Sequence, residues 1–238
     1  MNLGRRQFRP AWWAVVLTAL AVALFIALGM WQLQRAHLKE GIESRFEQRL
    51  AEPYQEVQSV DELQDVEYRK LRLQGRYDNS RNLLVDNQLH RGRAGYHVLT
   101  PLRLIDSDRI VLVNRGWVGW GASRDRLAPI LDPLTVGEVS GIAHFPSEPA
   151  LRMGGLTLSE NWPQLIPYVD IDALQPAFDG NLLPFVLWLA PEVQGAYVRD
   201  WKPVWMRPEK SRAYAVQWFA FAFLALVFFI ILNLRKIE

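Results

Sequence analysis

The sequence predicts a membrane protein in which two transmembrane helices, one near each end of the chain, flank a β-rich α+β domain. We expect that domain to be mostly antiparallel and extracytoplasmic. Residues 213–232 carry no charge, and a second apolar run follows the N-terminal tail. A helix of twenty residues covers about 30 Å, the thickness of a bilayer's hydrocarbon core. Between the two runs the chain alternates apolar and polar residues, as half-buried strands do.

The apolar run at residues 11–31 predicts a membrane-spanning helix that we place at 11–33. A cleaved signal peptide is the alternative, but its apolar region usually has roughly 7–15 residues and ends at a small-residue cleavage site. The longer run here favours an uncleaved anchor. Trp12, Trp13 and Trp31 lie at its two edges, where aromatic residues mark the membrane interface.

Two spans place both ends of the chain on one side of the membrane. We expect cytoplasmic tails at 1–10 and 233–238, spans at 11–33 and 213–232, and one domain outside the cytoplasm at 34–212. Basic residues flank the spans on both sides, so the positive-inside rule hardly separates the two orientations, and it also loses force for loops beyond about 60 residues.

The segments between the spans are assigned from their periodicity. Residues 34–50 predict a helix that continues out of the membrane, with Gly41 as a point where it can break. Residues 170–178 predict a short helix capped by Asp170 or Asp172, and 156–167 are expected to be irregular. The expected strands are 68–77, 82–89, 96–104, 109–118, 136–145 and 182–190. Short strands at this spacing predict a small antiparallel barrel or sandwich.

Residues 194–212 return the chain to the membrane. Trp201 and Trp205 are four residues apart there and alternate with basic residues, which fits interfacial anchors. A loop packed against the domain explains the same residues, and both interpretations stay open.

Composition excludes several classes of function. The chain has 27 basic and 25 acidic side chains, a net charge of +2, so no strong field indicates a nucleic-acid partner. The lack of cysteine excludes a disulfide framework, a thiolate zinc site and a thiol copper carrier. The four histidines do not cluster at ligand spacing, and neither a nucleophile elbow nor a phosphate-binding glycine loop is present. We therefore expect a protein that is not an enzyme.

One strand carries an unusual group, Asn114, Arg115, Gly116 and Trp117. Side chains two apart share a face of a strand, so Arg115 and Trp117 are expected together, as a cation–π pair or as a carboxylate-binding fork beside a flat apolar surface. The alternative is that Arg115 satisfies buried carbonyl groups at a barrel rim. His97 is expected to be a hydrogen-bonded histidine of the core or rim rather than a base.

The second span begins with two polar side chains, Tyr214 and Gln217. Polar groups in a span tend to face a partner helix. We expect both to share one helix face with Ser211 and to meet the first span.

Five stretches carry a family resemblance: 29–35, 69–77, 95–102, 111–118 and 214–219. In this order, between two spans, they resemble the surfeit-locus-one family of cytochrome c oxidase assembly proteins. The resemblance implies assistance in delivering haem a to subunit I of the oxidase, or in stabilising that subunit. It implies as partners subunit I, proteins of haem a biosynthesis or assembly, and the lipid bilayer, and no nucleic acid. Without a transit peptide in the tails, we expect a bacterial inner membrane with a periplasmic domain.

The resemblance also suggests site residues. Trp31, Arg35 and the group at 114–117 are expected to contact the partner. The residues expected to hold haem a transiently are His37, Ser211, Tyr214, Gln217 and Trp218. A membrane-tethered sensor or scaffold that binds a membrane partner without haem is the alternative function.

The iron ligand is the point where the sequence departs from the family. Many members have a histidine three residues before the tyrosine that corresponds to Tyr214, and that histidine is implicated in haem binding. Here the position is Ser211, whose hydroxyl is a poor ligand for haem iron. His37 lies six residues past Trp31, about 9 Å along a helix, and is the candidate replacement. The residues expected to pair with the propionates are Arg35, Lys39, Lys210 and Arg212.

Overall fold

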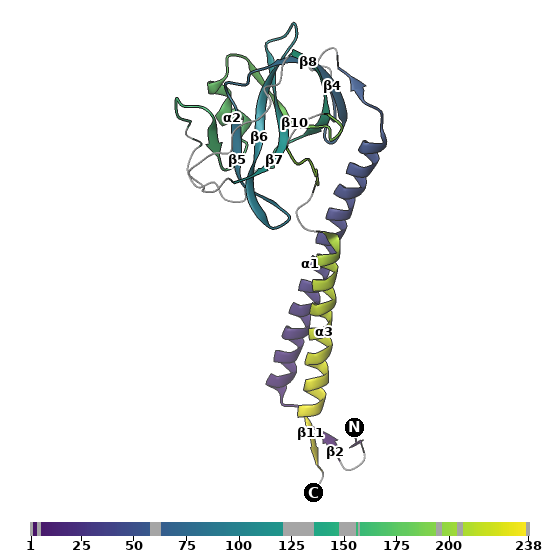
Figure 1. Ribbon diagram of the computed structural model, residues 1–238. Helices are drawn as coiled ribbons and strands as arrows, with labels where there is room; N and C mark the ends of the chain where they lie inside the picture. Colours follow the sequence, from purple (N-terminus) through teal and green to yellow (C-terminus); the bar gives the residue numbers. More distant parts are fainter. Residues whose placement is uncertain are drawn as a thin grey trace. The chain divides into compact units, whose positions relative to one another are not determined.

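The computed structural model describes residues 2–3, 6–57, 63–120, 136–147, 156, 158–193, 197–203 and 207–236. The chain divides into two compact units (Figure 1): Met1–Arg45 together with Lys202–Glu238, which we call the helical unit, and Phe46–Trp201, the β domain. Two long apolar helices near the ends of the chain flank a strand-rich middle, which confirms the predicted fold class. The boundaries given above between membrane and aqueous segments stay predictions.

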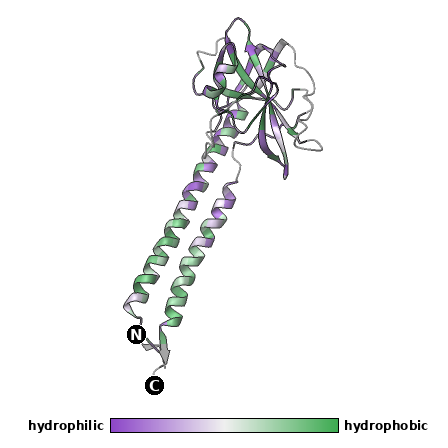
Figure 2. Cartoon of the chain, turned by 90° about the vertical axis from the view of Figure 1, so that its left-hand side faces the viewer, coloured by the Kyte–Doolittle hydropathy of each residue, from purple (hydrophilic) through white to green (hydrophobic). Residues whose placement is uncertain are grey.

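The two long helices are α1, Trp12–Ala51, and α3, Pro208–Leu232. Both are long and apolar enough to cross a membrane, and apolar residues cover most of α3 and the first half of α1 (Figure 2). α1 continues as predicted beyond the apolar run, and it passes through Gly41, the point where a break was possible, without interruption. An exposed glycine costs a helix about 1 kcal/mol relative to alanine, and the good helix formers on either side outweigh that.

Within the helical unit α1 and α3 pack through small residues. Gly29 and Ala36 of α1 and Ala215 and Ala222 of α3 are buried. A side chain at Gly29 would meet the ring of Phe219 at 2.5 Å, so the missing Cβ is what lets this ring approach. Small residues are the usual means by which membrane helices approach closely.

The tails pair with each other in a small sheet. Its strands are β1, Asn2–Leu3, β2, Arg6–Phe8, and β11, Leu234–Lys236, in the order β1-β2-β11. The two chain ends therefore lie together, as a pair of spans requires.

The β domain is built on a closed ring of strands. The strands are β3 Gln55–Glu56, β4 Lys70–Tyr77, β5 Leu83–His90, β6 Arg93–Leu104, β7 Arg109–Gly119, β8 Val136–His144, β9 Gln164–Ile166 and β10 Asn181–Leu189. Their order is β3-β4-β8-β10-β7-β6-β5-β9, and a further pairing of β4 with β6 closes five of them into a barrel. Most pairs are antiparallel; β3–β4, β7–β10 and β5–β9 are parallel. The predicted barrel or sandwich is thus a five-stranded barrel with three further strands, β3 beside β4 and the pair β5–β9 beside β6.

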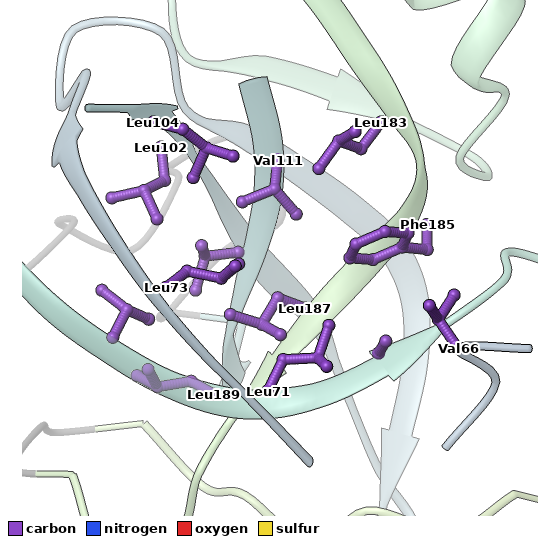
Figure 3. Packing of buried hydrophobic residues seen from close by; sticks show 13 residues of the cluster. Val66, Leu71, Leu73, Leu102, Leu104, Val111, Leu183, Phe185, Leu187 and Leu189 are labelled. Atoms are coloured by element: carbon purple, nitrogen blue, oxygen red, sulfur yellow. The ribbon is translucent and has the colours of Figure 1, made fainter. Parts of the chain in front are cut away.

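The barrel interior is apolar. Leu71 and Leu73 from β4, Val111 from β7 and Leu187 from β10 point toward one another (Figure 3), and each is at most 1% exposed. A second apolar cluster packs residues of β5, β6, β7, β9 and β10 against α2, Ile171–Leu174. Asp170 caps this helix as predicted, accepting a hydrogen bond from the backbone of Ala173.

Three local features were not expected from the sequence. Strands β5 and β6 are joined by a tight turn in which Arg91 and Gly92 both have positive φ, the geometry of a type I′ hairpin. The segment 156–167, expected to be irregular, contains the short strand β9. The sequence does not reveal this strand because a run of three residues is too short to show a period. Pro184 lies inside β10, where the pairing with β7 shifts register, as a proline without an N–H requires.

Candidate functional site

The group at 114–117 lies at a β-bulge in β7. Asn114 pairs with Leu99 and Gly116 with Val98, so Arg115 is an extra residue on this strand. The bulge reverses the alternation, and Asn114 and Trp117 come to share a face. The expected grouping of Arg115 with Trp117 on one face is therefore wrong, because a bulge cannot be read from a period of two.

Gly116 makes room for the segment that returns toward the membrane. Its φ is +125°, and a Cβ at this position would lie 2.7 Å from the carbonyl oxygen of Val198. The next residue, Trp117, donates its backbone N–H to that carbonyl at 2.8 Å and accepts from the N–H of Val198 at 3.0 Å. Any side chain at 116 would strain the backbone and push this bridge apart.

Arg115 is buried, with 3% of its surface exposed. Its guanidinium lies over the ring of Tyr197, 5.0 Å from the centroid. The cation–π contact therefore joins β7 to the returning segment, and this favours the internal role for Arg115 that was weighed above.

Trp117 lies flat across two glycines of the β6–β7 pair. Side chains at Gly95 and Gly119 would each meet its indole, at 2.7 Å and 3.2 Å. The indole Nε1 donates to the carbonyl of Gln88 at 2.9 Å, and the ring lies 5.2 Å from that of His90. The missing side chains of Gly95 and Gly119 therefore leave the space that the Trp117 indole fills.

His97 is hydrogen-bonded at the barrel rim, as predicted. Its Nδ1 lies 3.0 Å from Nδ2 of Asn114, whose Oδ1 accepts the N–H of Gly116 at 3.1 Å. This second bond fixes the amide orientation, so Nδ1 of His97 accepts and carries no proton. Burial lowers the pKa of His97 to about 4, with a smaller contribution from the charge of His90.

A row of aromatic rings in the β domain was missed from the sequence. Trp188 stacks on Trp201 at 5.2 Å and its ring lies 4.1 Å from that of His144, and Trp201 meets the ring of His97 edge-on at 5.7 Å. Trp201 also donates its Nε1 to the carbonyl of Leu189. It packs against the domain, so the loop interpretation holds for Trp201; Trp205 lies outside the described residues. The members come from distant strands, and nothing in their spacing joins them.

A carboxylate orients His144 in this row. Its Nδ1 lies 2.9 Å from one oxygen of Glu67, whose other oxygen accepts the N–H of Phe145. Burial would raise the pKa of Glu67, but these two hydrogen bonds outweigh it and the pKa is lowered. The pair ties the start of β4 to the end of β8.

In the helical unit, Ser211 faces α1 as expected. It is 4% exposed and accepts a hydrogen bond from Lys39 at 3.0 Å, and Arg212 pairs with Glu40 at 2.6 Å. Tyr214 is 47% exposed and Gln217 is also exposed, so the expectation that both meet α1 is wrong.

The stripe that does face α1 has a physical reason. Ser211, Ala215 and Ala222 repeat at helical spacing and are small enough for close packing, which the bulky Tyr214 is not. Trp218 lies beside this stripe and stacks on Phe25 at 5.9 Å.

His37 lies on the exposed part of α1. Its side chain is 71% exposed, and its Nδ1 is 3.4 Å from Glu40. Trp31 and Arg35 are exposed as well and form a cation–π contact at 5.4 Å. Of the predicted propionate partners, Lys39 and Arg212 are already bound within the helix pair.

Comparison with known proteins identifies the family. The family model of SURF1, the surfeit-locus-one family, matches residues 19–223. Surfeit locus protein 1 of Mus musculus is 32% identical over 122 residues, covering 45% of this chain and 39% of the mouse protein. The rat protein of that name is 31% identical over 177 residues, 64% of this chain and 54% of its own.

A yeast relative has a more specific name. Cytochrome oxidase assembly protein SHY1 of Saccharomyces cerevisiae is 32% identical over 105 residues, 43% of this chain and 26% of the yeast protein. The chain thus spans about half or less of the length of these curated relatives. Because the family model covers most of the chain, the protein belongs to the SURF1 family.

Proposed function

We propose that this protein is a membrane-anchored assembly factor for a haem–copper cytochrome oxidase. The observation that carries the proposal is the family match over residues 19–223, together with the oxidase-assembly name of the yeast relative. The protein acts on subunit I, by assisting the arrival of haem a or by stabilising the subunit before haem is inserted, and it performs no catalysis itself. Proteins of haem a biosynthesis or assembly act beside it.

The proposed location is a bacterial inner membrane, with the β domain in the periplasm. Support comes from two helices able to span a bilayer and from chain ends paired in one small sheet. A reporter active only outside the cytoplasm should work at the turn between Asp106 and Ser107 and be silent after Glu238. The reverse pattern would overturn the orientation.

The helix pair limits how haem a could be held. Ser211 is buried and its hydroxyl is bonded to Lys39, so this position does not fit an iron ligand. Among the expected binding residues the available imidazole is His37, whose Nε2 is not the nitrogen facing Glu40. We therefore assign any axial ligation by this chain to His37, with Tyr214, Gln217 and Trp218 of the second helix as contacts for the ring.

The assembly role is tested by deleting the gene and recording reduced-minus-oxidised spectra of the membranes. Loss of the haem a band with other cytochromes intact supports the proposal, and an unchanged spectrum with full oxidase activity would refute it. A scaffold acting without haem would instead leave haem a present in an oxidase that lacks other parts.

The ligand assignment is tested separately on protein purified from cells that make haem a. His37→Ala should lose the haem spectrum, and Ser211→Ala, the matched control, should keep it. If the wild type carries no haem, or His37→Ala keeps the same spectrum, His37 is not the ligand.

A further inference from the structure

The tip of the β5–β6 hairpin, residues 89–93, is basic and apolar at once. Leu89 is 56% exposed, and Arg91, Gly92 and Arg93 are exposed beside it. Within the described part of the chain neither arginine has an ion pair. The adjacent β7 ends opposite Gly95, so the tip projects past the neighbouring strand (Figure 1).

The turn at the other end of the same long strand carries carboxylates. β6 ends at a turn in which Ile105 is 48% exposed and is followed by exposed Asp106 and Asp108, while the exposed Arg103 before it donates to the carbonyl of Asp179. Twelve residues of strand separate the two ends by about 40 Å. The β domain therefore presents an exposed aliphatic residue at both ends of β6, with two exposed arginines in the turn at one end and two exposed aspartates in the turn at the other.

The chain leaves the β domain near the basic end. The Trp201 ring lies 5.7 Å from that of His97, which is four residues from Arg93 at the start of β6, and Val198 bridges to Trp117. Six residues then separate Trp201 from the first residue of α3, Pro208.

Chain length bounds the reach of this connection. Fully extended, the steps from Trp201 to Pro208 span about 25 Å at most. A domain joined to a membrane helix by so short a connection meets the bilayer at a high effective concentration, so a weak affinity of one of its surface elements suffices for docking.

We propose that the β5–β6 hairpin tip docks on an anionic lipid surface, with Leu89 entering the interface and Arg91 and Arg93 contacting lipid phosphates. Basic residues beside an exposed apolar residue are the pattern by which peripheral elements bind anionic bilayers. Docking holds the barrel end that carries Trp117 and Trp201 toward the membrane and the acidic turn away from it. The inference is independent of the oxidase-assembly role and needs no haem.

The experiment uses the full chain in lipid nanodiscs. The natural chain has no cysteine, so Leu89→Cys gives a unique site for an environment-sensitive fluorophore, and Ile105→Cys gives the matched control. Emission is compared between discs of phosphatidylcholine alone and discs that contain phosphatidylglycerol. At position 89 we expect a blue shift and an intensity gain of about twofold in the anionic discs, reversed by high salt; at position 105 we expect no change.

Charge variants show whether the arginines cause the docking. The double substitution Arg91→Gln and Arg93→Gln should abolish the response at position 89. The double substitution Arg91→Lys and Arg93→Lys should keep most of it, because attraction to a lipid surface depends on positive charge more than on the planar guanidinium group. Equal emission in both lipids, or an equal shift at position 105, would refute the proposal. A shift that appears only when oxidase is added and does not depend on lipid charge would also refute it, because the hairpin would then bind a protein.

Discussion

Acid should destabilise the β domain through His97. The ordinary pKa of histidine is about 6.5, and burial lowers that of His97 to about 4 in the folded chain. Between these values the unfolded state binds a proton that the folded state refuses, so the free energy of unfolding falls as the pH falls from about 6.5 to about 4. One pKa unit corresponds to about 1.4 kcal/mol, so the loss over this window is about 3 kcal/mol.

The geometry explains why the folded state refuses that proton. Nδ1 of His97 accepts the amide N–H of Asn114, whose oxygen is committed to Gly116. Protonation would place two donors face to face and break a bond at the bulge. Glu67, with a lowered pKa, adds a further loss, but only as the pH falls below its unfolded value near 4.5.

The assay is urea unfolding of the β domain in nanodiscs at a series of pH values, followed by tryptophan fluorescence. His97→Gln cannot take up the proton, so its slope between pH 6.5 and 4 should largely vanish even if its stability is lower throughout. His37→Gln, an exposed histidine of the helical unit, should leave the slope intact. A slope that survives in His97→Gln would refute the assignment.

Three further substitutions and one control test the packing. Gly116→Ala should cost about 2–3 kcal/mol in the same urea experiment, because strain at positive φ adds to a backbone clash; Gly92→Ala, with positive φ but open space around it, should cost about 1 kcal/mol. Arg115→Ala should cost about 2 kcal/mol or more, because the buried cation–π contact with Tyr197 is lost, and should lower the amount of protein in the membrane; normal protein with poor oxidase assembly would instead indicate direct partner contact. Gly29→Leu should destabilise the helix pair by about 1–3 kcal/mol against Phe219, measured by unfolding in mixed micelles, and an unchanged midpoint would contradict the packing.

The sequence predicts the elements of this fold because their signals are local. A twenty-residue apolar run and a period of two are visible within one segment, and the α1, α3 and β7 assignments rest on nothing else. The bulge at Arg115 is different, since it depends on which residues of β6 lie opposite. The row containing Trp188 and Trp201 depends on the closure of the barrel and on the path of the chain after β10.

The prediction of which face of the second helix meets α1 is wrong for another reason. From the sequence we expect Tyr214 and Gln217 at the helix interface because polar groups avoid lipid. The structure gives the interface to Ser211 and Ala215, because close approach requires small side chains. Polarity and side-chain size compete in setting which residues face the other helix. Here the small residues face it, and the buried polar residue Ser211 is satisfied by its hydrogen bond with Lys39 across the interface.

The motif around residues 111–118 can now be explained by its contacts. Arg115 holds Tyr197 and the backbone of Trp117 pairs with Val198, while His97 meets Trp201. All of these contacts are made by residues 197–201, the segment at which the chain leaves the β domain. Burial of the bulge leaves Arg115 little surface to offer a partner. Its internal role is to fix the point at which the chain leaves the β domain. Loss of function at this motif should therefore follow from a displaced exit segment, and partner contacts are better sought on the exposed neighbours of that segment.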